Sequence, residues 1–216
     1  LRSSPSSSSE PMRYSITSFS LSLSGCLCHS GYQFDGLGGG VLRSRFTNLD
    51  FAMNKEIEDK VKELSRRIVG TGQIVVTAES LTGGMISAAL TSIPGASEWF
   101  ERGFVTYTNQ AKHEMLDVPQ SILDRFSAVS TQTVSQMLEG AIRHSNATMA
   151  VAVSGIAGPD GAMPGRPVGT VFIGWKRKDE MAEVGRYEFK GDRQSVREQT
   201  VAVAIQGLIE MLDERQ

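Results

Sequence analysis

The chain has 216 residues, of which 40% are hydrophobic and 21% are charged, and its formal net charge is -2. These values allow one globular domain with a sizeable core. The small net charge argues against a nucleic-acid binder or a polybasic membrane-surface protein. No apolar run approaches the roughly 18–20 residues that are needed to span a bilayer.

Residues 1–52 differ in composition from the rest of the chain. They are rich in serine and glycine, show no sustained helical or strand period, and hold both cysteines, Cys26 and Cys28. We predict a disordered or non-native N-terminal extension. Three interpretations stay open: translated sequence upstream of a natural start at Met53, which we favour, an organelle transit peptide, or a disordered tail. Two cysteines one residue apart are a poor ligand set for zinc.

From residue 53 to residue 216 the hydrophobic pattern becomes regular and predicts one α/β domain. Helical spacing predicts helices over residues 54–69, 82–92, 109–116 and 193–213, with two more opened by Pro119 and Ser130. β-branched and aromatic runs predict strands over residues 74–77, 103–107, 148–154, 168–176 and 182–189. Helices and strands alternate in the first part of this region, and a β-hairpin follows late in the chain. This order indicates a three-layer α/β/α sandwich with a mostly parallel mixed sheet and an antiparallel edge.

A polar turn follows the first predicted strand. Residues 77–84 read TAESLTGG, so Glu79, Ser80 and Thr82 precede two glycines that lead into a helix. In open α/β sheets, ligands bind beyond the carboxyl ends of the strands, and helix N-termini attract anions. The pattern therefore favours a phosphate or oxyanion pocket. The alternative is that Ser80 or Thr82 only caps the helix, which is the commoner role for such residues.

A tyrosine and a lysine follow the second predicted strand. Tyr107 ends that strand and Lys112 lies about one turn into the next helix, so both can point toward the edge that carries Ser80. A serine nucleophile needs a base, which a lysine of lowered pKa can provide, and a tyrosine can relay the proton. His113 and His144 lie in no motif typical of a Ser-His-Asp triad. The alternatives are a solvated surface charge for Lys112 and an ordinary strand residue for Tyr107.

A glycine- and proline-rich loop over residues 155–167 follows the third predicted strand. Its backbone amides can cradle a phosphate or form an oxyanion hole. Loops of this length inside a compact domain are more often functional than plain turns. Arg166 in this loop and Arg193 at the start of the last helix can each pair with a phosphate, although a surface role is at least as common for either.

Taken together, these segments resemble the CinA C-terminal domain family, the nicotinamide-nucleotide amidases. The matching stretches are residues 77–84, 99–109, 128–130, 154–161, 167–170 and 191–193, within about residues 54–212. The resemblance implies hydrolysis of the carboxamide of nicotinamide mononucleotide to nicotinic acid mononucleotide and ammonia, in pyridine nucleotide recycling. It implies no metal and no organic cofactor.

The resemblance also implies site residues. Ser80 matches the nucleophile, and Tyr107 and Lys112 match its supporting groups, of which either can be the base. The chain departs from the family at Leu81, where a cysteine is usual, and at Ala162, where a second glycine is usual. From the resemblance and the polar strand ends, we expect substrate contacts from Glu79, Thr82, Gly83, Gly84, Asn109, Ser154, Gly155, Ile156, Ala157, Gly158 and Arg166.

We expect a small-molecule nucleotide as the partner, with no nucleic acid and no membrane. A homodimer or higher homo-oligomer is expected, and the lack of cysteine from Met53 onward favours a cytoplasmic location. Two other functions stay open. One is a non-catalytic nucleotide-binding or regulatory module linked to competence or DNA damage, and the other is an amidase that acts on another small amide.

Overall fold

The computed structural model describes residues 54–213, so the prediction for residues 1–52 lies outside the described residues. No helix in the described part is long and apolar enough to cross a membrane. The elements, in chain order, are α1 (Lys55–Ile68), β1 (Val75–Glu79), α2 (Met85–Leu90), a 3-10 turn η1 (Ala96–Glu98), β2 (Phe100–Val105), α3 (Asn109–Leu116), α4 (Gln120–Phe126), α5 (Thr131–Arg143), β3 (Met149–Gly155), β4 (Thr170–Arg177), β5 (Glu183–Glu188) and α6 (Arg193–Asp213).

One five-stranded sheet has the order β2-β1-β3-β4-β5. β1 pairs in parallel with β2 and β3, whereas β4 pairs antiparallel with β3 and β5. The mixed sheet and its antiparallel side are thereby confirmed. β1 is buried along its whole length and β3 along nearly all of it, because helices cover both faces of these central strands.

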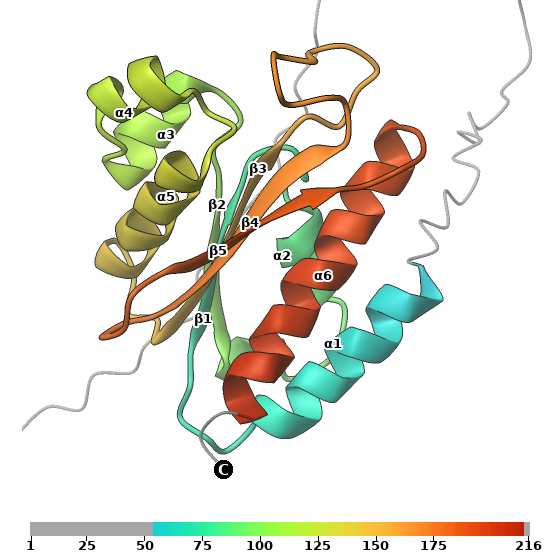
Figure 1. The fold of residues 1–216 in the computed structure, drawn as a ribbon. Coiled ribbons are helices and arrows are strands. Elements are labelled where there is room, and N and C mark those ends of the chain that lie inside the picture. The colour runs from blue at the N-terminus through green and yellow to red at the C-terminus, as the bar shows by residue number, and fades with distance from the viewer. Residues whose placement is uncertain (1–53, 214–216) are drawn as a thin grey trace, which may run out of the picture. The chain divides into compact units, whose positions relative to one another are not determined.

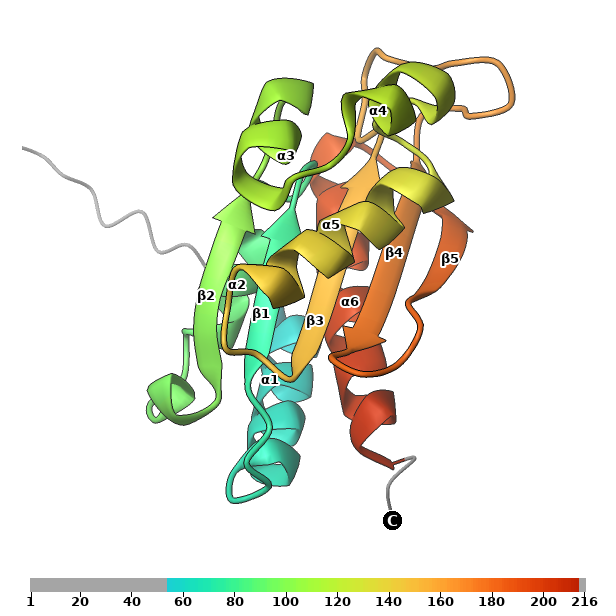
Figure 2. The same cartoon turned by 90° about the vertical axis from the view of Figure 1, so that its left-hand side faces the viewer.

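Helices form a layer on each face of the sheet. Figure 1 shows the sheet edge-on between α1, α2 and α6 on one side and α3, α4 and α5 on the other, and Figure 2 shows α5 lying across the second face. Each layer has its own apolar core, one built around Leu64, Trp99 and Ile205 and the other around Leu116, Met137 and Leu138. The predicted three-layer α/β/α sandwich is therefore confirmed.

Two predicted elements differ by three residues at their starts, whereas the other elements whose bounds were predicted agree to within two residues. The helix predicted over residues 82–92 begins only at Met85, because Gly83 and Gly84 adopt positive φ angles of 60° and 98° and hold a turn before it. The strand predicted over residues 103–107 runs instead over Phe100–Val105, because parallel pairing with β1 starts at Phe100. Tyr107 therefore lies beyond the strand, in the connection to α3. The bounds of α3 and α6 are as predicted.

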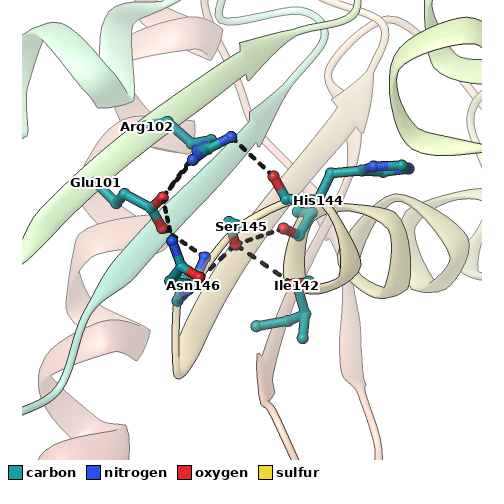
Figure 3. Close-up of polar contacts among 8 residues, drawn as sticks. Glu101, Arg102, Ile142, His144, Ser145 and Asn146 are labelled. Carbon is teal, nitrogen blue, oxygen red and sulfur yellow. Dashed lines mark hydrogen bonds and ion pairs between the residues drawn. The ribbon is translucent and has the colours of Figure 1, made fainter.

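A polar cluster bonds the amino end of the edge strand β2 to residues at the end of α5 and beyond it (Figure 3). The Glu101 carboxylate accepts hydrogen bonds from the backbone N–H of Asn146 at 2.7 Å and from its side-chain amide at 3.3 Å, and it pairs with Arg102. Arg102 also donates to the His144 carbonyl at 2.9 Å. Because Glu101 and Arg102 lie on β2 and their partners His144 and Asn146 follow α5, the cluster joins β2 to the loop after α5.

The close packing of α3 on α5 leads to a first prediction. A Cβ added at Gly140 would lie 2.1 Å from the carbonyl oxygen of Leu116, the last residue of α3. In an open helix, glycine to alanine gains about 1 kcal/mol. Here we expect Gly140→Ala to lower the free energy of unfolding by roughly 2 kcal/mol, because the backbone of α3 must move away.

Urea unfolding measures this change, and Gln132→Ala, at an exposed position of the same helix, is the control. We expect the control to stay within about 0.5 kcal/mol of the wild type. Equal stability of Gly140→Ala and the wild type would show that the two helices are not in tight contact. Because α3 also carries Lys112, the same variant should lose activity.

Candidate active site

Ser80 and Lys112 meet at the carboxyl edge of the parallel strands. β1 ends at Glu79, so Ser80 is the first residue beyond it, and Lys112 lies in the second turn of α3. The Lys112 Nζ lies 3.0 Å from the Ser80 Oγ and donates to the Thr106 carbonyl at 2.8 Å. The two side chains that the sequence places 32 residues apart are thus in hydrogen-bond contact.

Lys112 is an unusually buried lysine. Its side chain is only 1% exposed, and its hydrogen-bond partners, a hydroxyl and a carbonyl, are uncharged. Burial lowers the pKa of Lys112 from 10.5 to about 8, because the charged ammonium loses its hydration. About a tenth of the molecules then carry a neutral amine at pH 7, enough to serve as a general base. The surface-charge alternative for Lys112 is wrong.

Tyr107 lies at the rim of the site rather than beside the serine. Its side chain is 57% exposed, and its hydroxyl accepts a hydrogen bond from Arg193 at 2.9 Å. Arg193 also donates to the Gly158 carbonyl at 2.8 Å. Within residues 54–213 no hydrogen bond joins the Tyr107 hydroxyl to Ser80 or Lys112. Of the two groups considered as the base, Lys112 is therefore the one in contact with Ser80.

A cavity of about 210 Å³ opens over the pair. The strand ends and loops that carry the predicted site residues meet here, and a rim arginine comes from α6. The lining residues are Ser80, Leu81, Tyr107, Lys112, Ala128, Val129, Ser154, Gly155, Ala157 and Arg193. Ala128 and Val129 have no reactive side chain, so only their position in the stretch 128–130, which matches the family, indicates a place in the site.

Two lining residues have well-defined surroundings. Ser154 donates its hydroxyl to the Ala128 carbonyl at 2.7 Å, so it holds the two walls of the cavity together. Leu81 is 4% exposed and belongs to the apolar core beneath the turn. An apolar side chain therefore suits this position, which accounts for Leu81 where the family usually has cysteine.

The start of α2 is occupied by the chain's own carboxylate. Glu79 is fully buried, and its two oxygens accept hydrogen bonds from the backbone N–H groups of Gly84, Ile86 and Ser87 at 2.8 to 3.0 Å. The hydroxyls of Thr82 and Ser87 also donate to it, each at 2.7 Å. An anion site at this helix N-terminus is therefore already filled. The predicted substrate contacts of Glu79 and Thr82 do not fit this geometry, and both residues hold the turn instead.

The other expected contacts divide between the cavity and its surroundings. Gly83 and Gly84 line a separate groove with Met85 and Ala88, and the Gly83 N–H is bonded to the Ser80 carbonyl. Arg166 lies outside the cavity, because its guanidinium donates to the Phe126 carbonyl and to Ser127. Of the two arginines considered for a phosphate, only Arg193 lines the cavity. Ile156 is buried, and its backbone is hydrogen-bonded to Thr170 and Gly169. The Gly158 carbonyl accepts a hydrogen bond from Arg193. Asn109 is exposed at the start of α3.

The surroundings of Glu79 lead to a second prediction. All of the groups that hydrogen-bond to the Glu79 carboxylate are N–H or O–H donors, so the amide nitrogen of a glutamine would face a donor. We expect Glu79→Gln to lower the free energy of unfolding by about 2–4 kcal/mol, because buried donors lose their charged acceptor. Thermal and urea unfolding measure the loss. Glu98→Gln, at an exposed carboxylate, should change little, and a similarly small effect at Glu79 would contradict this account.

The fold and the site together define a class of protein: an α/β domain with a buried serine–lysine pair at the carboxyl ends of parallel strands. The chain belongs to the CinA C-terminal domain family, whose family model matches residues 57–212.

Two relatives match this chain over nearly all of their own length. The nicotinamide-nucleotide amidohydrolase PncC of Enterobacter agglomerans is 45% identical over 152 residues, which are 70% of this chain and 93% of the relative. The protein of the same name from Escherichia coli K12 is 41% identical over 155 residues, 72% of this chain and 94% of the relative. The matched part of the chain thus corresponds to a whole protein in these bacteria.

Solved structures agree with the fold. The competence/damage inducible protein CihA of Agrobacterium tumefaciens superposes with a TM-score of 0.72 at 41% identity, covering 74% of this chain and 98% of that one. The competence damage-inducible protein A of Klebsiella pneumoniae gives a TM-score of 0.71 at 35% identity, covering 74% and 99%. Sequence and fold therefore lead to the same family.

Proposed function

We propose that this chain is a nicotinamide-nucleotide amidohydrolase, which converts nicotinamide mononucleotide and water to nicotinic acid mononucleotide and ammonia. The observation that carries the proposal is the 3.0 Å contact between the Ser80 Oγ and the buried Lys112 Nζ at the floor of a cavity. Relatives that are 41–48% identical bear the name of this activity. An activated serine is one of the nucleophiles that can attack an amide carbon.

The reaction begins with Lys112 in its neutral form. The Lys112 amine accepts the hydroxyl proton of Ser80 while the Ser80 Oγ attacks the carboxamide carbon, which gives a tetrahedral intermediate with a negative oxygen. The Thr82 N–H of the turn after Ser80, or N–H groups of the loop after Gly155, stabilise this oxygen. Lys112 then returns the proton to the amide nitrogen and ammonia leaves. Water hydrolyses the acyl-enzyme with Lys112 again as the base.

Arg193 gives the site its preference for a nucleotide. Its guanidinium is exposed at the rim of the cavity, where the Tyr107 hydroxyl and the Gly158 carbonyl orient it. A guanidinium held in this way can bind two oxygens of a phosphate through parallel hydrogen bonds. We assign the phosphate of the substrate to Arg193 and the carboxamide to Ser80.

Ammonia release tests the proposal. The purified full chain is assayed with nicotinamide mononucleotide, nicotinamide riboside, nicotinamide and NAD in parallel. We expect the mononucleotide to be hydrolysed fastest, because it alone combines the carboxamide with a terminal phosphate. Turnover of a different small amide with the mononucleotide inert would point to a general amidase. Binding of the mononucleotide in calorimetry without ammonia release would point to a non-catalytic module.

The proposal includes a cytoplasmic location and a homo-oligomer. The sequence from Met53 onward holds no cysteine, which suits a reducing compartment. Val105 on β2 and Met115 on α3 are 44% and 41% exposed, more than is usual for large apolar side chains, and a second copy would cover them. Sedimentation of the full chain tests the second point, and a monomer at assay concentration would contradict it.

A further inference from the structure

The carbonyls of the two residues that follow Ser80 face an arginine on α6. Arg197 donates from its Nε to the Leu81 carbonyl at 3.1 Å and from an Nη to the Thr82 carbonyl at 2.8 Å. The guanidinium is a rigid planar fork, so it can hold two successive carbonyls at once where a single ammonium cannot. A residue more than a hundred positions along the chain thus fixes the backbone next to the candidate nucleophile.

Two side chains bind the backbone of this turn, one through its N–H groups and the other through its carbonyls. Glu79 takes the N–H groups of Gly84, Ile86 and Ser87, whereas Arg197 takes the carbonyls of Leu81 and Thr82. Because a peptide group is planar, a fixed Leu81 carbonyl also fixes the direction of the Thr82 N–H. Arg197 therefore controls where the Thr82 N–H points, two residues beyond Ser80, and this N–H is a candidate donor to the oxyanion.

Arg197 is well placed to exert this control. Val196 and Val201 on α6 are at most 1% exposed and belong to the core beneath the sheet, so the helix that carries the guanidinium is firmly packed. A Cβ added at Gly83, whose φ is 60°, would lie in ordinary contact with an Nη of Arg197 at 3.8 Å, so the guanidinium lies directly against the turn. Arg197 does not line the cavity, whereas Arg193, one turn earlier, does.

We propose that Arg197 is a positioning residue, whose guanidinium aligns Ser80 and the Thr82 N–H for attack through the carbonyls of Leu81 and Thr82. This inference rests on the proposed function, in which Ser80 is the nucleophile. It predicts that loss of Arg197 lowers the reactivity of Ser80 and leaves the binding of substrate largely intact, because Arg197 does not contact the cavity.

Two readouts on the full chain test the inference. The first is kcat and KM for nicotinamide mononucleotide. The second is the rate at which a fluorophosphonate modifies Ser80, followed by intact mass, which depends on the serine and not on the physiological substrate. The variants are Arg197→Met, Arg197→Lys and Ser80→Ala, with Arg66→Met as a matched control at an exposed arginine of α1. Thermal unfolding of each variant establishes that it is folded at the assay temperature.

For Arg197→Met we expect kcat and the labelling rate to fall together by roughly 10- to 100-fold, the loss that a misplaced reacting group causes, while KM stays within about threefold. Arg197→Lys should recover only part of this loss, because one ammonium does not reproduce the fork. Arg66→Met should match the wild type. If Arg197→Met does not fold, Arg197→Lys carries the test and must label measurably more slowly than the wild type.

Three outcomes separate this inference from the proposed function. Slower labelling of the Arg197 variants in a protein that does not hydrolyse the mononucleotide would keep the inference and remove the proposed substrate. Wild-type labelling and turnover in a folded Arg197→Met, or a loss confined to KM, would overturn the inference and leave the function intact. If Ser80 of the wild type reacts by neither route, it is not a nucleophile and both proposals fall.

Discussion

Replacing Ser80 by alanine should reduce ammonia release from nicotinamide mononucleotide by at least about 10⁴-fold, the scale of loss when a serine nucleophile is removed. The physical reason is that no other hydroxyl lies within hydrogen-bond distance of the Lys112 Nζ in the described part of the chain. Any residual rate would then come from binding and from backbone donors alone. Initial rates of ammonia release at saturating substrate measure the change.

The fold of the Ser80→Ala variant should persist. Ser80 is 8% exposed and its hydroxyl makes one side-chain hydrogen bond, to Lys112, so its removal costs about 1 kcal/mol of the free energy of unfolding. Calorimetric binding of nicotinamide mononucleotide should remain, because Arg193 is unchanged. Undiminished turnover in a folded Ser80→Ala variant would exclude Ser80 as the nucleophile.

The second large effect concerns pH. The base must be neutral, and burial places the pKa of Lys112 at about 8, so kcat/KM should rise with pH and level off above about 8. The neutral fraction grows from about 1% at pH 6 to about half at pH 8, so the rate should increase about 50-fold over this interval. Assays from pH 6 to pH 9.5 measure the profile. A rate that is constant across this range would contradict Lys112 as the base.

The same pKa has a consequence for stability. The folded pKa of about 8 lies below the ordinary value of 10.5, so the unfolded chain binds more protons between these values and stability should rise with pH in this window. Below pH 8 the buried lysine costs the fold about 3 kcal/mol. Lys112→Met removes this cost but also the hydrogen bonds to the Ser80 hydroxyl and the Thr106 carbonyl, each of which is worth about 1 kcal/mol or less.

We therefore expect Lys112→Met to be about 1–2 kcal/mol more stable than the wild type at pH 7 and yet to lose at least about 10²- to 10⁴-fold in activity, the contribution of a general base. Its stability advantage should shrink as the pH rises from 8 to 10.5. Urea unfolding at pH 7 and pH 10 measures both points. A variant that is less stable at both pH values would show that Lys112 is not strained by burial.

The amino-acid pattern by itself determined the layers of the fold. The 3.6-residue period of α6 and the β-branched runs of β1 and β3 depend on local sequence, so their type could be predicted, and their bounds could be predicted to within two residues. The starts of α2 and β2 could not, because a positive φ at Gly83 and the parallel register with β1 decide them. The sequence likewise did not indicate that the Leu81 side chain faces the core.

The sequence also supplied Ser80, Tyr107 and Lys112 as candidates, because each follows a strand that ends at one edge of the sheet. Only the tertiary structure separated them, since a distance of 3.0 Å and near-complete burial distinguish Lys112 from a surface lysine, and Tyr107 turned out to contact Arg193. The role of Glu79 could not be predicted from the motif either. A buried carboxylate needs hydrogen-bond donors, and the N–H groups at the start of α2 provide them. The helix N-terminus at which the sequence predicted an anion pocket therefore binds Glu79 instead.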